Sequence, residues 1–273
     1  MRTLSLGRKD SSVYLYFQKC GDIIEAQLNY KELNNMNRTI DTNILLPKFI
    51  DYCKNNFELK KTGGYEYKSM SVCILECIYS LRAKTESTAN VVKRYANAYL
   101  NGDVNRSGDT VTNLLTNIQA IGGSEEFKKQ ILKNEQKCGG KNPIPKEQTC
   151  YQLAQYLSYL HIDTMEDFRN YEHQDFLETV IRSVPGIGEA GMQYLFMLTG
   201  DENRCKPDVW IHRCIKKACG QDVSDVDCQT LFKEAVAELK MEYPNLTMRG
   251  LDSIIWYNDC LLYTSPSPRD RQK

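Results

Sequence analysis

Residues 184–198, with the sequence VPGIGEAGMQYLFML, constrain the fold of this chain more than any other stretch. Gly186, Gly188 and Gly191 follow a G-x-G-x-x-G pattern, and Asp208 comes seventeen positions after the last of them. Such a pattern occurs in the phosphate loop of dinucleotide-binding domains. The same letters also suit a tight turn between two helices that hold a nucleic-acid phosphate. The residues on either side of the stretch separate the two interpretations.

A dinucleotide-binding loop requires a buried strand directly before its first glycine. The preceding residues instead carry apolar side chains at the spacing of a helix, at Phe176, Leu177, Val180 and Ile181. Pro185 stands where the last ladder donor of the strand would be. Asp208 follows a Cys-Lys-Pro sequence and opens a helix, whereas a ribose-binding acid would end a second strand. The context therefore favours a helix–turn–helix.

In that interpretation one helix ends near Val184 and the next begins near Glu189. The glycines allow the backbone to approach a phosphate, and the unpaired amides at the start of the second helix can bind the anion. Ile187 is expected to anchor the turn in the core. The predicted nucleic-acid-binding hairpin comprises Pro185, Gly186, Ile187, Gly188, Glu189, Ala190 and Gly191. An ordinary connection that uses glycines for geometry alone fits this short motif equally well.

The composition is that of a globular protein with one good core or two small ones in 273 residues. Its 35 basic and 35 acidic residues cancel, so a nucleic-acid partner requires the basic residues to gather on one face. No apolar run approaches the roughly 18 residues of a membrane span, and the start lacks the apolar core of a secretory signal. Eleven cysteines suggest reduced thiols, and we expect a cytoplasmic protein.

The hydrophobic pattern predicts a mainly α-helical chain with a small β-hairpin at its start. SVYLYFQK and DIIEAQLNY flank a Cys-Gly-Asp turn at 20–22, which indicates the hairpin. Helical periodicity begins at NILLPKF and continues to about 262, with two helices in 69–100 separated near Lys84–Ser87. Further helices are predicted at 110–121, 125–136, 149–160, 165–171, 175–184, 209–219, 230–243 and 251–262, and a loop at 138–149. The tail 264–273 resembles a translated sequencing adaptor, so we expect it to be non-native.

The run from Val184 to Ile215 resembles the signature of the helix-hairpin-helix Gly/Pro-Asp (HhH-GPD) superfamily of DNA base-excision glycosylases. The hairpin 184–188, the apolar helix 192–198 and the stretch 206–213 match its L-P-G-I/V-G hairpin, helix and aspartate-bearing segment. The interval of twenty residues from Gly188 to Asp208 also agrees. Val209-Trp210 departs from the pattern, where Thr-His is common. Looser similarity at 73–95 and 251–258 extends the resemblance over roughly residues 69–262.

The resemblance implies a two-lobed helical fold. One lobe would comprise residues 69–202 and end in the hairpin, and the other, carrying the catalytic aspartate, residues 41–68 and 203–262. Residues 1–40 would form a β-hairpin extension. Double-stranded DNA is the implied partner, and we expect a monomer that does not bind membranes.

The resemblance assigns catalysis to Asp208, whose carboxylate would stabilise positive charge on the sugar and orient the attacking water. A simple helix cap is the alternative role of this residue. Members that also cleave the strand carry a lysine two positions after the second hairpin glycine, where this chain has Ala190. We therefore expect a monofunctional enzyme that leaves an abasic site. Lys84 or Lys93 would substitute only in a different fold.

The candidate DNA contacts are Arg82, Lys206, His212 and Arg213. Arg82 replaces a glutamine of many family members and is equally well explained as a solvated helix-end cation or as a wedge that fills the gap of an extruded base. Cys205, Cys214, Cys219 and Cys228 lack the spacing of the family's iron–sulfur cluster, so we expect packing thiols and no metal. No cofactor is expected, apart from a monovalent cation that the hairpin would hold.

The excised base is the least constrained feature. A strand-bearing extension resembles the branches that act on alkylated and oxidised bases, and the region 101–148 is longer than in compact members. These features suggest a damaged or modified base; one specific hypothesis is a glucosylated hydroxymethylcytosine of phage DNA, removed in antiviral defence. Repair of alkylated, deaminated or oxidised bases is an alternative. A non-catalytic DNA-binding module that uses Asp208 only as a cap is another.

Overall fold

A computed structural model describes the backbone of residues 4–9, 12–19, 22–28, 41–60, 67–140 and 142–264. It describes the side chains of residues 41–60, 67–140 and 142–258. Of the expected non-native tail, all but Thr264 lies outside the described residues. Within them, no helix is long and apolar enough to cross a membrane.

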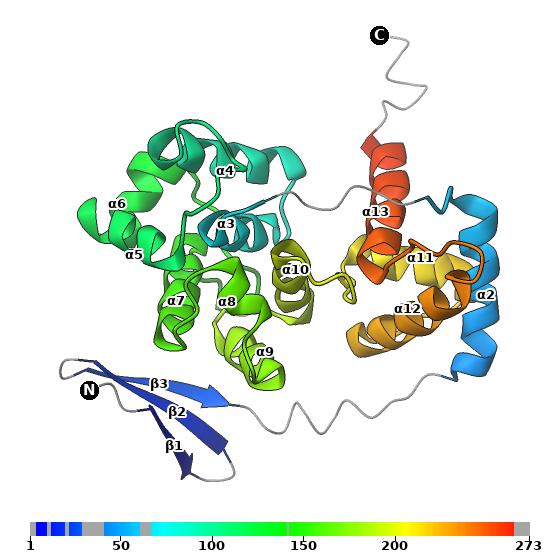
Figure 1. Cartoon of the computed structure of the whole chain (residues 1–273), viewed down its shortest axis with the longest axis horizontal. Helices are drawn as coiled ribbons and strands as arrows, with labels where there is room; N and C mark the ends of the chain where they lie inside the picture. The colour runs from blue at the N-terminus through cyan, green and yellow to red at the C-terminus, as the bar shows by residue number, and fades with distance from the viewer. Residues whose placement is uncertain are drawn as a thin grey trace. The chain divides into compact units, whose positions relative to one another are not determined.

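The first strands form a three-stranded antiparallel sheet in the order β1-β2-β3 (Figure 1). The strands are β1 (Leu4–Lys9), β2 (Ser12–Lys19) and β3 (Asp22–Leu28). The pairing of β2 with β3 is the hairpin that the alternating apolar residues predict. β1 was not predicted, because its sequence LSLGRK has only two apolar positions before a glycine and two cations. β1 pairs antiparallel with β2, from Leu4 opposite Phe17 to Lys9 opposite Ser12.

The rest of the described chain is helical, as the periodicity predicts. The described chain divides into two compact units: the first comprises the three strands and residues 67–199, and the second comprises 41–60 together with 200–264. Each unit has a hydrophobic core of its own.

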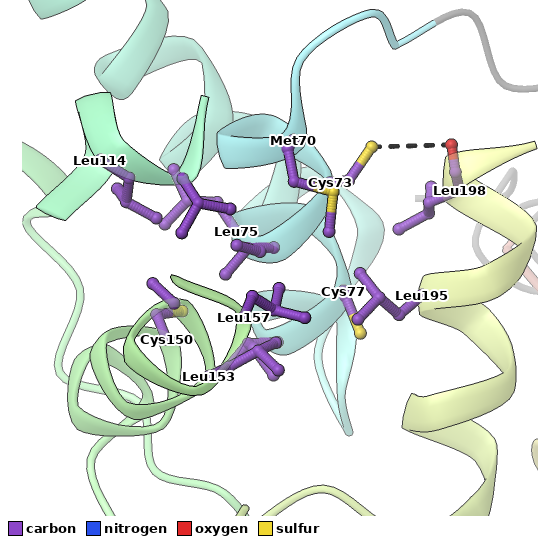
Figure 2. Packing of buried hydrophobic residues seen from close by; sticks show 14 of the residues in the cluster. Met70, Cys73, Leu75, Cys77, Leu114, Cys150, Leu153, Leu157, Leu195 and Leu198 are labelled. Carbon is purple, nitrogen blue, oxygen red and sulfur yellow. Dashed lines mark hydrogen bonds between the residues drawn. The ribbon is translucent and has the colours of Figure 1, made fainter. Parts of the chain in front are cut away.

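The helices of the first unit are α3 (Met70–Ser80), α4 (Thr85–Tyr99), α5 (Val111–Ala120), α6 (Ser124–Phe127), the π-helix η1 (Lys128–Leu132), α7 (Lys146–Tyr159), α8 (Met165–Arg169), α9 (Gln174–Ser183) and α10 (Glu189–Thr199). Helix α3 is at the centre. Nine of its eleven residues are buried, and most of them are apolar, which is typical of a helix in the interior of a domain. Figure 2 shows Leu75 near Leu114 of α5 and Leu157 of α7, while Cys77 faces Leu195 of α10.

The second unit contains α2 (Thr42–Asn56), α11 (Val209–Cys219), α12 (Asp225–Leu239) and α13 (Met248–Thr264). Helix α2 buries Leu45, Phe49, Ile50 and Cys53, which recur at helical spacing in the sequence. The ring of Phe49 packs against Phe232 of α12 with centroids 5.4 Å apart. This packing brings a segment from early in the chain against the helices that follow residue 200.

Several predicted boundaries are wrong. Helix α12 begins at Asp225 and not at 230, because Ser224 and Asp227 form a capping box at its start. Helix α7 begins at Lys146 inside the predicted loop 138–149, because Pro145 has its φ fixed at −55° and its carbonyl accepts the first helical N–H bonds. In place of the predicted helix 125–136, the short helix α6 is followed by the π-helix η1, which ends at Leu132. Lys133 then adopts the left-handed conformation. The break between α3 and α4 lies at Leu81–Lys84, before the position that the sequence suggested.

Candidate nucleic-acid interface and active site

The stretch 184–191 is a turn between two helices of the first unit. Helix α9 ends at Ser183, and α10 begins at Glu189, so no strand precedes the glycines. Ile187 is 6% exposed, and its N–H donates to the carbonyl of Val184 at 3.1 Å. The expected helix–turn–helix is confirmed, and the dinucleotide interpretation is excluded by this geometry.

Gly186 is required by the packing of the turn. Its φ is +93°, a conformation that side chains disfavour. A Cβ at this position would lie 2.6 Å from the Cβ of Cys138 and 2.9 Å from its sulfur. The hydroxyl of Thr149 donates to the carbonyl of Pro185 at 3.0 Å and fixes the same turn from α7. The first glycine of the pattern therefore serves the fold.

Gly188 differs from Gly186, because it is exposed and a Cβ there would meet no atom within 4 Å. Its carbonyl accepts the first helical bond of α10, from Met192 at 3.0 Å. Within the described part of the chain, the N–H groups of Glu189, Ala190 and Gly191 have no hydrogen-bond partner. An open glycine in front of unpaired amides at a helix start is a suitable arrangement for binding an anion.

A carboxylate stands at the same helix start. Glu189 accepts hydrogen bonds from Arg182 Nη1 at 3.1 Å and from Gln193 Nε2 at 2.8 Å. The Arg182 contact crosses the turn from α9 and compensates the charge of Glu189, whose side chain is 16% exposed. The sequence analysis did not identify Arg182, because the only indication of its role was that Arg182 and Glu189, seven residues apart, have opposite charges.

The turn between α3 and α4 neighbours the hairpin. The Leu81 side chain comes within 3.2 Å of the position a Cβ on Gly191 would take, and Arg82 follows it, exposed and with φ +51°. The Arg82 guanidinium lies against Gly139, whose neighbour Cys138 contacts the hairpin at Gly186. The structure thus brings the predicted DNA contact Arg82 close to the predicted hairpin within one unit.

Lys146 supports this turn and was missed by sequence analysis. Its side chain is almost fully buried, and its ammonium donates to the carbonyls of Tyr79 and Leu81 at 2.9 and 2.8 Å and to Gln136 Oε1 at 3.1 Å. The cation therefore satisfies carbonyls at the C-terminus of α3, where the helix dipole also favours positive charge.

Asp208 begins α11 in the second unit as its N-cap. Its Oδ1 accepts hydrogen bonds from the N–H groups of Trp210 at 2.8 Å and Ile211 at 3.3 Å. The side chain is half-buried, and its Oδ2 has no hydrogen-bond partner among the described residues. One oxygen thus serves the helix and leaves the other available for chemistry.

The loop that carries Asp208 is fixed by α12 and α13. Asp252 Oδ2 accepts the N–H of Lys206 at 2.7 Å, and the N–H of Asp208 donates to the Lys206 carbonyl at 2.6 Å. Gln229 of α12 hydrogen-bonds both the N–H and the carbonyl of Cys205. Burial, and then the charge of Asp208, raise the pKa of Asp252 to about 8. The resemblance of 251–258 to a closing helix gave no sign of this contact.

The other predicted contacts differ in their surroundings. Lys206 is half-buried, and Arg213 is exposed, with its guanidinium 5.1 Å from the ring centre of Trp210. His212 is engaged inside the unit, where its Nε2 lies 2.8 Å from Asp225 Oδ1 and its Nδ1 3.8 Å from Cys228 Sγ. The hydrogen bond to Asp225 raises the pKa of His212.

The cysteines near Asp208 pack in the second core. Cys205, Cys214, Cys219 and Cys228 are buried and form no disulfide, and burial raises the pKa of Cys205 well above its usual value. In the described residues, no group of three or more histidine, cysteine or acidic side chains is arranged to hold a metal.

Two comparisons with known proteins give matches that cover most of the chain. The chain is similar over 95% of its length to 86% of the 8-oxoguanine glycosylase/lyase of Clostridium acetobutylicum, solved in complex with double-stranded DNA containing cytosine opposite 8-oxoG. The TM-score is 0.51 at 10% sequence identity, which shows likeness of fold. No curated protein matches. The family model described as "Domain of unknown function (DUF8548)" matches residues 48–259, and the chain therefore belongs to this family.

Proposed function

We propose that this protein is a DNA N-glycosylase that extrudes a damaged or modified base from double-stranded DNA and hydrolyses its bond to the sugar. One observation carries the proposal. A chain with a fold similar to that of a DNA glycosylase combines an open glycine turn before α10 with a partly free carboxylate at Asp208. The two features lie in the regions where sequence resemblance expects the DNA-binding hairpin and the catalytic aspartate.

The hairpin would bind the DNA backbone. The amides of Glu189, Ala190 and Gly191 offer donors to one phosphate, and Gly188 leaves room for it. Because Arg182 compensates the carboxylate of Glu189, that charge repels the phosphate less. Arg82 would contact the duplex nearby, as a wedge at the extruded base or as a phosphate contact. Lys206 and Arg213 are proposed phosphate contacts near Asp208.

Base release develops positive charge on the sugar. Asp208 Oδ2 would face that charge and orient the attacking water, while Oδ1 keeps the carboxylate fixed on α11. Ala190 offers no amine, so we propose that the enzyme leaves an abasic site without cleaving the strand. The substrate hypothesis remains a damaged or modified base, with a bulky phage cytosine as its most specific form.

The alternative is a DNA-binding module without activity. The N-cap observed at Asp208 supports this alternative, because it gives the residue a structural role that requires no catalysis. Asp208→Asn separates the two functions, because asparagine is also a good N-cap and preserves the helix start. For a glycosylase, we expect Asp208→Asn to reduce single-turnover base release by at least about 100-fold with DNA affinity unchanged. Asp222→Asn is the matched control, since it removes one exposed charge from the same unit. Equal base release by the wild type and Asp208→Asn would exclude Asp208 catalysis.

A further inference from the structure

Asp252 is a buried carboxyl group with a specific backbone contact. The residue is 4% exposed on α13, and its Oδ2 accepts the N–H of Lys206 at 2.7 Å. An isolated buried carboxyl group costs folding free energy, and a leucine or valine would fill the core at less cost. Its presence therefore needs a role beyond packing.

The contact leads through one residue to Asp208. The N–H of Lys206 donates to Asp252 Oδ2, and the carbonyl of Lys206 accepts the N–H of Asp208 at 2.6 Å. Asp208 in turn places Oδ1 on the amides of Trp210 and Ile211. A shift of the Lys206 backbone would therefore move the start of α11 and the carboxylate attached to it. A misplacement of about 1 Å at a reacting group can cost about 100-fold in rate.

The charges around Asp252 explain why a carboxyl group tolerates this position. Asp208 and Lys206, both on the loop before α11, act on it, and Cys205 of the same loop is buried beside both acids. From α12, the polar residue that contacts this loop is the neutral Gln229. Arg249, on the same helix as Asp252, pairs with Glu202. Because the pKa of Asp252 is about 8, its carboxyl is neutral at pH 7, and Asp208 does not face a second buried negative charge.

We propose that Asp252 is a positioning residue for base release, which acts through the Lys206 backbone to fix the start of α11 and with it the carboxylate of Asp208. The inference rests on the proposed function, since it assumes that Asp208 is catalytic. It assigns to α13 a part in the reaction without contact with DNA.

The test compares Asp252→Asn and Asp252→Ala, with Ser253→Ala as the control next to it on α13. Asparagine keeps an oxygen for the Lys206 N–H and resembles the neutral acid, whereas alanine removes the acceptor. We expect Asp252→Ala to lower the single-turnover rate of base release by about 10- to 100-fold, with DNA affinity within about twofold. Asp252→Asn should restore the rate to within about threefold of the wild type.

The pH profile adds a result that a purely structural role would not produce. Above about pH 8 Asp252 ionises and repels Asp208, so the wild-type rate should fall, and Asp252→Asn should keep its rate. Identical profiles for these two proteins would overturn the proposal, as would a fully active Asp252→Ala or an Asp252→Asn as impaired as Asp252→Ala.

Hydrogen exchange distinguishes failure of this proposal from failure of the proposed function. Asp252→Ala should exchange faster than the wild type in the peptide that covers 204–211, while Asp252→Asn should not. A wild type that releases no base would overturn the proposed function and any role of Asp252 in base release. Unchanged exchange in Asp252→Ala would refute the contact through Lys206 even if the enzyme is active.

Discussion

Replacing Gly186 by alanine tests whether the hairpin has the packing described. The new Cβ would lie 2.6 Å from the Cβ of Cys138, and the residue would have to keep φ near +93°. Gly188→Ala is the matched control, because it adds the same methyl group two residues later, where no atom lies within 4 Å. The two glycines of one motif should therefore respond differently.

The magnitude follows from two terms. A left-handed backbone costs a non-glycine residue about 1–2 kcal/mol. Displacing the Cys138 side chain in a packed core costs about 1–3 kcal/mol more. We expect Gly186→Ala to lower the free energy of unfolding by about 2–5 kcal/mol in total. Gly188→Ala should be neutral or stabilise by up to about 1 kcal/mol, since alanine has fewer unfolded conformations.

Urea unfolding measures stability, and titration of a fluorescent duplex measures DNA binding. We expect Gly188→Ala to lose affinity for DNA while remaining folded, because its methyl group would block the approach of a phosphate. Adding Cys138→Gly to Gly186→Ala removes the colliding atoms and should show a coupling energy of about 1–3 kcal/mol in a double-mutant cycle. Cys138→Ala retains the colliding Cβ and should rescue less. Full stability of Gly186→Ala, or equal destabilisation by both alanines, would refute the account of this turn.

Three further predictions concern charges inside the two units. The folded state keeps Asp252 protonated up to about pH 8, whereas the unfolded state does not. Between pH 5 and 7, the free energy of unfolding of the wild type should therefore fall relative to that of Asp252→Asn by about 1.4 kcal/mol per pH unit, measured by urea unfolding. Parallel curves of unfolding free energy against pH for the two proteins would contradict this. Asp225→Asn should lower the pKa of His212 in an NMR titration, because the hydrogen bond to Asp225 raises that pKa. In the wild type, the stability that the His212–Asp225 pair contributes is lost as the pH rises through the raised pKa of His212. Lys146→Met should destabilise the protein by about 1–3 kcal/mol, because carbonyls of α3 lose their donor, and hydrogen exchange should increase at 79–83; unchanged exchange would argue against the cap.

The sequence predicts best what depends on local pattern. Helix α11 begins and ends where the run VWIHRCIKKAC does, because Asp208 caps its start and Gly220 adopts the left-handed conformation at its end. The buried face of α2 follows from the spacing of four apolar residues. The turn at 185–188 follows from Pro-Gly-Ile-Gly between two helical patterns.

The missed features depend on contacts between distant residues. Lys146 and Asp252 have ionisable side chains, so a pattern of apolar and polar positions assigns them to the surface. Lys146 is buried because the end of α3, more than sixty residues earlier, presents carbonyls to it. Asp252 is buried because it meets a backbone N–H 46 residues away. Neither partner leaves a periodic signal in the sequence.

In the candidate site, too, the sequence predicts local motifs but not the contacts between distant residues. Sequence resemblance named Asp208 and the hairpin, but it did not distinguish Gly186, which the fold requires, from Gly188, which is open. It also named His212 as a candidate DNA contact, whereas the ring contacts Asp225 and Cys228 inside the second unit. Such differences arise from tertiary packing, which a short motif does not encode.

The central claim is that Asp208 releases a base from DNA. Its most direct test incubates the protein with unmodified, alkylated, deaminated, oxidised and glucosylated-hydroxymethylcytosine duplexes under single-turnover conditions, followed by alkali, which converts abasic sites into strand breaks. We predict alkali-dependent breaks at the modified base in at least one duplex with the wild type, and breaks that form at least about 100-fold more slowly with Asp208→Asn. Tight binding without breaks in any duplex, or equal breaks with both proteins, would contradict the claim.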